Sequence, residues 1–532
     1  MTGTRLPLDG AHWIDHVARH AFATPDDVAI RFMGESITWA QLDERIHQVA
    51  AGLAARGVNK GDRVAILMTN RPEFVETTLG ANAIGAIAVP LNFRLAPDEV
   101  AFILGHSGSK VVVTDALLAP LATAAVAASA DAPLIVVSGL EGDGGDSANG
   151  GGADTISYDA LLGDRADEPE VEIDERDVSM IMYTSGTTGR PKGAMLTHLN
   201  LLMQSVTAIR TSRLQGDNVV SLCNVPLFHI AGIGGMPSSL MIGARTVIMP
   251  TGLFDAESTL DIVESEQITT LFLVPAQWQV LCAHPDATRR CASLRTIAWG
   301  AAPASVSLLE DMARVFPHCE IISVFGQTEM SPVTTSLPGV DAVRKIGSVG
   351  KVIPTIVARV VDDEMNDVKP GEVGEIVYRG PTLMAGYWND PEATAEAYAG
   401  GWFHSGDLVR ADEEGFLYVV DRKKDMIISG GENIYCAEVE NVLAGHPGVA
   451  DVAVIGIPHD KWGETPAAVV VAADPSSPPT LDDLVEYSRD RLASYKKPTA
   501  LAVLDELPRN ASGKVLKHEL RARHAKGELP TS

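Results

Sequence analysis

The stretch that decides the fold is Arg63-Val64-Ala65-Ile66-Leu67-Met68, a short aliphatic run that predicts a buried strand. A helical apolar pattern follows over 72–84, a second strand-like run over 86–91 and another helical pattern over 96–106. A third strand-like run, 110–114, continues the alternation. Strands that alternate with helices in this way predict a parallel sheet with helices on its faces.

The same alternation returns further along the chain. Strand-like runs, each followed by a polar or glycine-rich turn, cover 219–225, 244–249, 270–275, 294–299 and 321–324. After about residue 340 the strands shorten, which predicts a β-rich subdomain, and from Asp421 the pattern is typical of a small α+β domain. We therefore predict an α/β fold with a large N-terminal domain over 1–421, a hinge over 422–426 and a small C-terminal domain over 427–532.

Composition and charge exclude several kinds of partner. The 532 residues carry 42 Lys+Arg against 69 Asp+Glu, a formal net charge of −27, which argues against nucleic acid or an anionic membrane as the main partner. The five cysteines are scattered and show no metal-ligand spacing. No signal segment and no run of about 18 apolar residues is present, so we expect a cytoplasmic protein without a transmembrane segment. Peripheral contact with a membrane stays open.

A loop rich in hydroxyl groups and glycine follows the apolar run 179–182. It reads Tyr183-Thr184-Ser185-Gly186-Thr187-Thr188-Gly189-Arg190-Pro191-Lys192-Gly193. Backbone N–H groups and hydroxyls donate to phosphate oxygens, glycine allows close approach, and a lysine adds positive charge. The loop departs from the P-loop pattern at Pro191, where that pattern needs glycine. It predicts a phosphate-binding site, and an ordinary solvent-exposed loop is the alternative interpretation.

Three conspicuous turns follow predicted strands of the second series. They are 226–229, 300–303 and 325–329. Because ligands of open α/β sheets lie beyond the carboxyl ends of the strands, we expect these turns to line a binding site.

Read together, several stretches resemble the motifs of the adenylate-forming superfamily, which includes acyl-CoA synthetases, adenylation domains of peptide synthetases and luciferases. The resemblance runs from about Ser36 to Leu520. Residues 401–408 and 415–424 are similar to the signature of the bacterial fatty-acyl-CoA ligases of the FadD class. The motifs are Tyr183–Gly193, Phe325–Glu329, Gly401–Leu408, Asp421–Asp425 with Gly430–Asn433, and Pro508–Lys514.

The resemblance implies that ATP, Mg²⁺ and coenzyme A take part in a two-step reaction. A carboxylate attacks the α-phosphate of ATP, and a thiol then displaces AMP. Glu329 is expected to hold Mg²⁺ together with Thr184, since a carboxylate beside a turn suits a hard cation, and an exposed loop glutamate is the alternative. The remaining phosphate contacts are expected from Ser185, Gly186, Thr187, Thr188, Gly189, Lys192 and Thr328.

The nucleoside is assigned by the same resemblance. Phe325 is expected to face the adenine, with core packing as the alternative. Asp407 is expected to accept hydrogen bonds from the ribose hydroxyls, and Arg422 is expected to donate to the ribose. The alternative interpretations are an ordinary turn aspartate for Asp407 and a surface ion pair for Arg422. The other residues expected around the nucleotide are Gly300, Ala301, Ala302, Gly326 and Gln327.

Lys514 is the residue expected to promote adenylation, because its flexible stem carries an ammonium to the phosphate and the attacking carboxylate. The small C-terminal domain is expected to rotate between the two steps, with Lys424 at the hinge. A solvated basic run is the alternative for Lys424. Gly430 and Gly431 are expected to line the pantetheine path. His229 is expected to gate the acyl and thiol paths, and a core or helix-capping histidine is the alternative interpretation.

The acid is the least determined part. Acetate-type relatives carry tryptophan where this chain has Gly326, so the resemblance implies a longer or bulkier acid. Trp278 is expected on a pocket wall, with an ordinary core tryptophan as the alternative. We predict a medium- to long-chain fatty-acyl-CoA ligase. A ligase that loads an acyl carrier protein, a CoA ligase for an aryl, alicyclic or steroid-side-chain acid, and a non-catalytic nucleotide-binding regulator are the alternatives. Family analogy favours a homodimer.

Overall fold

The computed structural model describes residues 12–130, 132–139, 154–184, 191–214, 218–252, 254–300, 304–509 and 515–529. The chain forms two compact units. The first comprises Met1–Val357 with Tyr378–Phe403, and the second comprises Ala358–Val377 with His404–Ser532. The predicted hinge at 422–426 falls within the second unit and stays a prediction.

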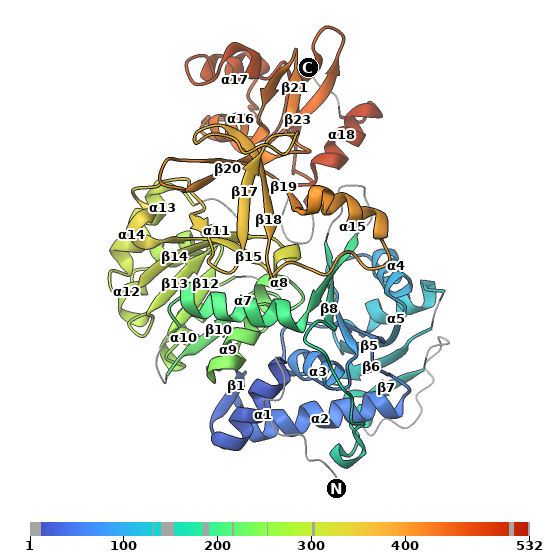
Figure 1. Ribbon diagram of the computed structural model, residues 1–532. Coiled ribbons are helices and arrows are strands. Elements are labelled where there is room, and N and C mark those ends of the chain that lie inside the picture. The colour runs from blue at the N-terminus through green and yellow to red at the C-terminus, as the bar shows by residue number, and fades with distance from the viewer. Residues whose placement is uncertain are drawn as a thin grey trace. The chain divides into compact units, whose positions relative to one another are not determined.

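The first unit contains a seven-stranded sheet in the order β7-β6-β5-β3-β4-β8-β9, in which only the terminal pair β8–β9 runs antiparallel among the described pairings. This confirms the predicted parallel sheet. Its elements are β3 (Arg63–Leu67), α3 (Pro72–Ala83), β4 (Ile87–Pro90), α4 (Pro97–Ser107), β5 (Ser109–Asp115), α5 (Ala119–Ala128), β6 (Leu134–Ser138), β7 (Thr155–Ser157), α6 (Tyr158–Leu161), β8 (Val178–Thr184) and β9 (Lys192–Thr197). Figure 1 shows β5, β6, β7 and β8 of this sheet near the helices α3, α4 and α5.

A nine-stranded sheet completes the first unit in the order β16-β15-β14-β13-β12-β10-β11-β1-β2. Its helices and strands include the second predicted β/α series and an N-terminal hairpin. They are α1 (Trp13–Ala23), β1 (Val28–Phe32), β2 (Glu35–Thr38), α2 (Trp39–Ala55), α7 (His198–Thr211), β10 (Val220–Cys223), α8 (Ile230–Ile233), α9 (Met236–Ile242), β11 (Arg245–Ile248), α10 (Ala256–Ser265), β12 (Thr270–Leu273), α11 (Pro275–Ala283), α12 (Ala287–Arg290), β13 (Thr296–Trp299), α13 (Val306–Val315), β14 (Glu320–Gly326), β15 (Val333–Pro338), α14 (Gly339–Ala342) and β16 (Lys351–Val352), with α15 (Pro391–Ala397) in the returning segment.

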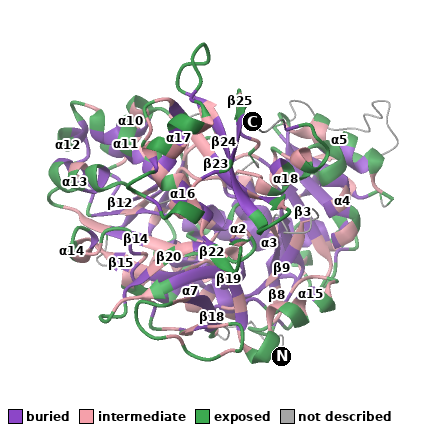
Figure 2. Ribbon diagram, turned by 90° about the horizontal axis from the view of Figure 1, so that it is seen from above, coloured by how far each residue is buried: buried purple, intermediate pink, exposed green. Residues whose placement is uncertain are grey.

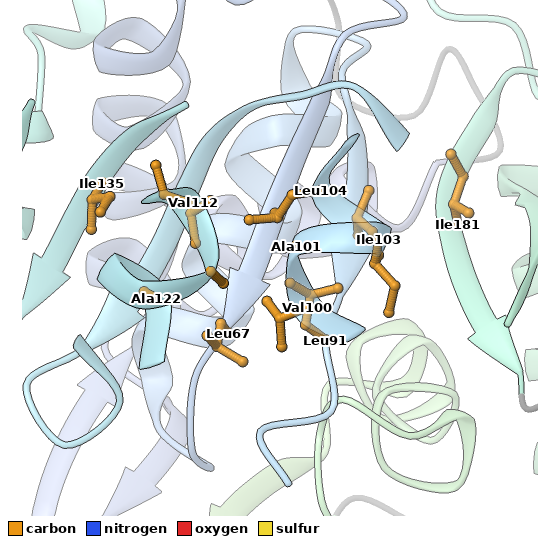
Figure 3. Packing of buried hydrophobic residues seen from close by; sticks show 14 of the residues in the cluster. Leu67, Leu91, Val100, Ala101, Ile103, Leu104, Val112, Ala122, Ile135 and Ile181 are labelled. Carbon is orange, nitrogen blue, oxygen red and sulfur yellow. The ribbon is translucent and has the colours of Figure 1, made fainter. Parts of the chain in front are cut away.

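The core of the seven-stranded sheet follows from the alternation of side chains along each strand. Ala65 and Leu67 of β3 pack with Val100 and Leu104 of α4 and with Ala122 of α5 (Figure 3). Residues between them in β3, such as Ile66, are also fully buried, so both faces of the sheet are covered. Burial of one leucine or isoleucine of this kind stabilises the fold by roughly 1.5–3 kcal/mol.

Local hydrogen bonds fix where helices start in the first unit. Thr38 and Gln41 form a capping box at the start of α2, and Thr197 and Asn200 form another at the start of α7. Each box satisfies N–H groups that a helix end leaves without partners. Since Thr197 also ends β9, α7 begins directly at the edge of the sheet.

The second unit holds the β-rich subdomain and the small α+β domain. A four-stranded sheet has the order β17-β18-β19-β20, and a five-stranded sheet has the order β22-β21-β24-β23 with β25 beside β24. Figure 2 shows buried residues along strands and exposed residues on the outer faces of helices. The elements are β17 (Val357–Val361), β18 (Val373–Arg379), β19 (Phe403–Ala411), β20 (Leu417–Arg422), β21 (Ile427–Ser429), β22 (Glu432–Ile434), α16 (Cys436–Leu443), β23 (Val449–His459), β24 (Gly463–Ala472), α17 (Leu481–Tyr487), β25 (Ala500–Leu504) and α18 (Lys517–Ala525).

Two observations bear on the surroundings of the protein. The helices in the described ranges are all too short or too polar to traverse a lipid bilayer. All five cysteines are free thiols, and burial raises the pKa of the Cys223 thiol to about 12.

We expect the stability of the first unit to fall in mild acid because of His198. Its side chain is 2% exposed, its ring lies 4.7 Å from that of His12, and burial, aided by His12, lowers its pKa to about 3. Between pH 6.5 and about 3 the unfolded chain therefore binds a proton that the folded chain does not. The free energy of unfolding should fall by up to about 1.4 kcal/mol per pH unit as the pH drops through this window.

Urea unfolding at several pH values between 4 and 7 measures this slope. The slope should be smaller in a His198→Gln variant, whose amide does not titrate. Equal slopes in the two proteins would show that His198 is not the group responsible.

Candidate functional site

The predicted phosphate-binding stretch is the end of a β-hairpin. Tyr183 pairs with Gly193 and Thr184 pairs with Lys192 across β8 and β9. Thr184 Oγ1 lies 3.5 Å from the carbonyl oxygen of Lys192, at the outer limit of a hydrogen bond. The predicted contacts Ser185, Gly186, Thr187, Thr188 and Gly189 lie outside the described residues. The hairpin thus places Thr184 and Lys192 opposite each other as its last pair, on either side of residues 185–191 in the chain.

Glu329 lies in a single 3₁₀ turn, Thr328–Met330, after β14. It is 9% exposed, and Oε1 of its carboxylate accepts a hydrogen bond of 3.1 Å from the Tyr387 hydroxyl. Its backbone oxygen accepts from the Met384 N–H at 2.9 Å. Burial and the nearby Glu329 carboxylate raise the pKa of Tyr387, so this hydroxyl stays protonated and donates.

Lys192 also contacts Tyr387, the residue that donates to Glu329. Its ammonium nitrogen lies 5.2 Å from the centre of the Tyr387 ring, a cation–π contact. Two predicted residues, Lys192 and Glu329, therefore contact one tyrosine in the first unit, and Thr184 is the strand partner of Lys192. Tyr387 stands in none of the motifs described above, and it is 58 positions from Glu329 in the chain, so no local pattern could have revealed it.

The donors in this part of the first unit fit Mg²⁺. Glu329 offers carboxylate oxygens and Thr184 a hydroxyl, which are hard ligands, and Mg²⁺ is usually held by one or two carboxylates together with substrate phosphates. No group of three or more His, Cys, Asp or Glu side chains with metal-binding geometry occurs in the parts of the chain that the structure covers. The chemistry therefore suits a metal bound with ATP better than a metal bound by the protein alone.

The turn that carries the predicted adenine contacts is tightly packed. A Cβ atom on Gly326 would lie 1.9 Å from the carbonyl oxygen of Pro332, which also accepts from the Gln327 N–H at 2.9 Å. Glycine at 326 is therefore required by the course of the backbone. The longer or bulkier acid that the resemblance implies from Gly326 stays a prediction.

The structure describes two of the other four residues that were predicted to contact the adenine. Phe325 is half-buried near the end of β14, and Gly300 is buried directly after β13, the strand beside β14. Ala301 and Ala302 lie outside the described residues. The two described residues thus occupy carboxyl ends of neighbouring parallel strands, where nucleotide ligands of α/β sheets are held.

Trp278 packs as a core residue. Its side chain is 0% exposed, its ring lies 5.6 Å from that of Phe316, and its Nε1–H donates to the Ala298 carbonyl oxygen at 2.9 Å. This geometry favours the core tryptophan over the pocket wall.

His229 caps a short helix. The residue is exposed at the start of α8, and its Nδ1 accepts a hydrogen bond of 3.1 Å from the Ala231 N–H. The neutral ring therefore carries its proton on Nε2. The capping alternative is what the structure shows, and the gating role stays a prediction.

We expect His229→Ala to lower the free energy of unfolding by about 0.5–2 kcal/mol, because it removes the cap acceptor. His229→Asn should restore most of this stability, since asparagine is a good N-cap. Thermal melting measures both variants. If the ring also gates the second step, His229→Asn will slow thioester formation without lowering the melting temperature.

In the second unit, Asp407 of β19 and Arg422 of β20 are paired. Asp407 is 2% exposed, its Oδ1 lies 2.8 Å from Arg422 Nε, and its N–H donates to Ser405 Oγ at 3.0 Å. The structure therefore brings the two predicted ribose contacts together on adjacent strands. A carboxylate held in place by a guanidinium offers fixed oxygens that can accept from hydroxyl groups.

The predicted hinge and pantetheine residues are also in the second unit. Lys424 is exposed in the turn after β20. Gly430 has a left-handed backbone, φ +61°, and a Cβ there would lie 2.7 Å from the Trp462 ring, so the position requires glycine. Gly431 follows it in the tight turn between β21 and β22. Lys514 lies outside the described residues.

Comparison with known proteins places the chain in a family. Residues 17–388 match the AMP-binding enzyme family, and residues 438–514 match the AMP-binding enzyme C-terminal domain. A feruloyl-CoA synthase from Amycolatopsis sp is 41% identical over 511 residues, 95% of this chain and 97% of that protein. A long-chain-fatty-acid–CoA ligase from Mycobacterium tuberculosis is 39% identical over 490 residues, 92% and 93% of the two chains.

A solved structure agrees with these matches. The o-succinylbenzoate CoA synthetase of Bacillus subtilis, in complex with its acyl-adenylate intermediate, superimposes with a TM-score of 0.81 at 32% identity, covering 95% of this chain and 97% of that one. The same synthetase has also been solved with ATP and a magnesium ion. The chain therefore belongs to the AMP-binding enzymes of the adenylate-forming superfamily, as one of the acyl- or aryl-CoA ligases that use ATP, Mg²⁺ and CoA.

Proposed function

We propose that this enzyme activates an aryl-containing acid and joins it to CoA. The observation that carries the proposal is the similarity, over 95% of the chain, to a synthase named for ferulate. The structural relative named for o-succinylbenzoate also acts on an acid with an aromatic ring. The longer or bulkier acid that the resemblance implies from Gly326 is compatible with an aryl-containing acid.

A fatty acid is the second candidate. The mycobacterial long-chain-fatty-acid–CoA ligase is nearly as similar to this chain as the feruloyl-CoA synthase is. The two candidates share the same first step and differ only in the shape of the acid.

The first step forms a bond between the acid's carboxylate oxygen and the α-phosphorus, and it breaks the bond from that phosphorus to the bridging oxygen of pyrophosphate. Both partners are anions, so positive charge and alignment lower the barrier most. Lys192 and the hydroxyl of Thr184 would contact the phosphates, and Glu329 would hold Mg²⁺. When bound, Mg²⁺ supplies further positive charge at the phosphate oxygens.

The second unit would contribute the other contacts. Asp407 and Arg422 would bind the ribose, and Lys514 would place its ammonium beside the carboxylate and the α-phosphate. In the second step the CoA thiol, after losing its proton, attacks the acyl carbon, and AMP leaves with the electrons of the broken carbon–oxygen bond. A rotation at 422–426 between the two steps, with Gly430 and Gly431 along the pantetheine path, completes the proposal. We place the enzyme in the cytoplasm, and the free thiols support this.

A panel of acids tests the proposal. AMP and pyrophosphate release would be measured with ATP and Mg²⁺ for ferulate, o-succinylbenzoate, octanoate, palmitate and acetate, each with and without CoA. Highest kcat/KM for ferulate or o-succinylbenzoate, with turnover only when CoA is present, is the expected result. Highest kcat/KM for palmitate would favour the fatty acid. Pyrophosphate exchange without turnover in CoA would indicate a carrier protein as the acceptor.

A further inference from the structure

Residues 385–388 form backbone hydrogen bonds with β9, the second strand of the β8–β9 hairpin, as a neighbouring strand would. The Ala385 N–H donates to the Met195 oxygen at 2.8 Å, the Met195 N–H donates to the Gly386 oxygen at 2.9 Å, and the Trp388 N–H donates to the Gly193 oxygen at 2.7 Å. Ala194 and Tyr387 form an antiparallel bridge. The backbone of Tyr387 is therefore fixed against β9, opposite Ala194.

Further contacts limit the movement of Tyr387 itself. Its N–H donates to Thr394 Oγ1 at 2.9 Å, and the nearby Met384 N–H holds the backbone oxygen of Glu329 at 2.9 Å. From this fixed base the side chain reaches Glu329 through its hydroxyl and Lys192 through its ring. One residue therefore touches both the proposed metal ligand and the lysine of the phosphate loop.

We propose that Tyr387 is a positioning residue that sets the direction of the Glu329 carboxylate toward Mg²⁺ and holds the Lys192 ammonium beside the phosphates. The inference rests on the proposed role of Glu329 as the Mg²⁺ ligand. It adds a residue that is needed for metal binding although it does not touch the metal.

The physical reason is the freedom of the two side chains. A glutamate has three rotatable bonds, and the hydrogen bond from Tyr387 to Oε1 selects one orientation and so aims Oε2. A lysine ammonium on a four-carbon stem has still more freedom, and the ring face holds it at 5.2 Å. Partners that orient a metal ligand typically contribute about 10–100-fold to metal affinity.

The test separates the hydroxyl from the ring. Tyr387→Phe keeps the ring over Lys192 and removes the donor to Glu329, whereas Tyr387→Leu removes both. Tyr398→Phe is the matched control, because the Tyr398 hydroxyl donates to the backbone oxygen of Met384 in the same segment and not to Glu329. Mn²⁺ binding would be measured by electron paramagnetic resonance in the presence of a non-hydrolysable ATP analogue, so that the readout does not depend on turnover.

We expect Tyr387→Phe to weaken Mn²⁺ binding roughly 10-fold or more and Tyr398→Phe to leave it within about twofold. Tyr387→Leu should in addition weaken binding of the ATP analogue through Lys192. Titrations would be run well below the melting temperature of every variant, so that a loss of stability does not imitate a loss of affinity.

Glu329→Gln distinguishes the two ways in which the inference could fail. If Glu329→Gln weakens Mn²⁺ binding and Tyr387→Phe does not, Tyr387 has no positioning role and the role of Glu329 stands. If Glu329→Gln binds Mn²⁺ as the wild type does, the proposed metal ligand is wrong and the inference falls with it. In the double variant, the loss should equal that of Glu329→Gln alone, because Tyr387 acts through Glu329. Losses that simply add would overturn the inference.

Discussion

Lys514→Ala is expected to lower the rate of acyl-adenylate formation by roughly 10²–10³-fold, the usual cost of removing a positioned electrostatic group from a transition state. The ammonium would act on the attacking carboxylate and the α-phosphate only during the first step. Thioester formation from acyl-adenylate supplied together with CoA should therefore stay close to the wild-type rate. ATP–pyrophosphate exchange and thioester formation, measured separately, report the two steps.

Lys526→Ala is the control for this prediction. Lys526 is exposed at the end of α18, twelve positions after Lys514. Its substitution by alanine removes the same charge from the same unit. Its exchange rate should match that of the wild type. An equal loss in both steps for Lys514→Ala would contradict a role confined to adenylation.

Trp278→Ala is expected to lower the free energy of unfolding of the first unit by about 3–5 kcal/mol. The substitution leaves a cavity against Phe316, and the Ala298 carbonyl oxygen loses the hydrogen bond from Nε1. Urea unfolding followed by a probe in the first unit measures the change. Phe22→Ala, also in the first unit, should cost far less, because that aromatic side chain is 85% exposed.

Trp278→Phe decides between the core position and a pocket wall. It retains an aromatic ring but removes the hydrogen bond and part of the ring volume, so it should lose part of the stability and leave the order of preferred acids unchanged. A changed order in the same panel of acids would place the Trp278 ring at the acid and contradict the core interpretation.

The sequence predicted most elements of the first unit because their patterns are local. The run at 63–68 became β3, Arg63–Leu67, and the helical pattern at 72–84 became α3, Pro72–Ala83. Each depends on apolar spacing within one element, which the printed sequence shows directly. The α/β fold class and the superfamily are confirmed by the structure and the comparisons.

Pairings between distant segments could not be predicted in this way. Lys192 and Gly193 of β9 were predicted to lie in a polar loop, and the strand form of β9 comes from pairing with β8 on one side and with the segment at 384–388 on the other. The contact from Tyr387 to Glu329 likewise depends on how the chain returns to the first unit. The close approach of the Pro332 carbonyl oxygen to Gly326 could not be predicted either, because it arises only in the folded turn.

The pairing of the N-terminal hairpin with β11 has a consequence for synthesis on the ribosome. Ile30 of β1 is the parallel partner of Thr246, so one edge of the β1–β2 hairpin has no strand to pair with until β11 has emerged. At about 5–20 residues per second this wait lasts roughly tens of seconds. The segment at 384–388, which forms hydrogen bonds with β9 at the edge of the seven-stranded sheet, is translated later still. The nascent chain thus carries an open sheet edge for much of its translation, and an open edge is the feature that favours pairing with other chains.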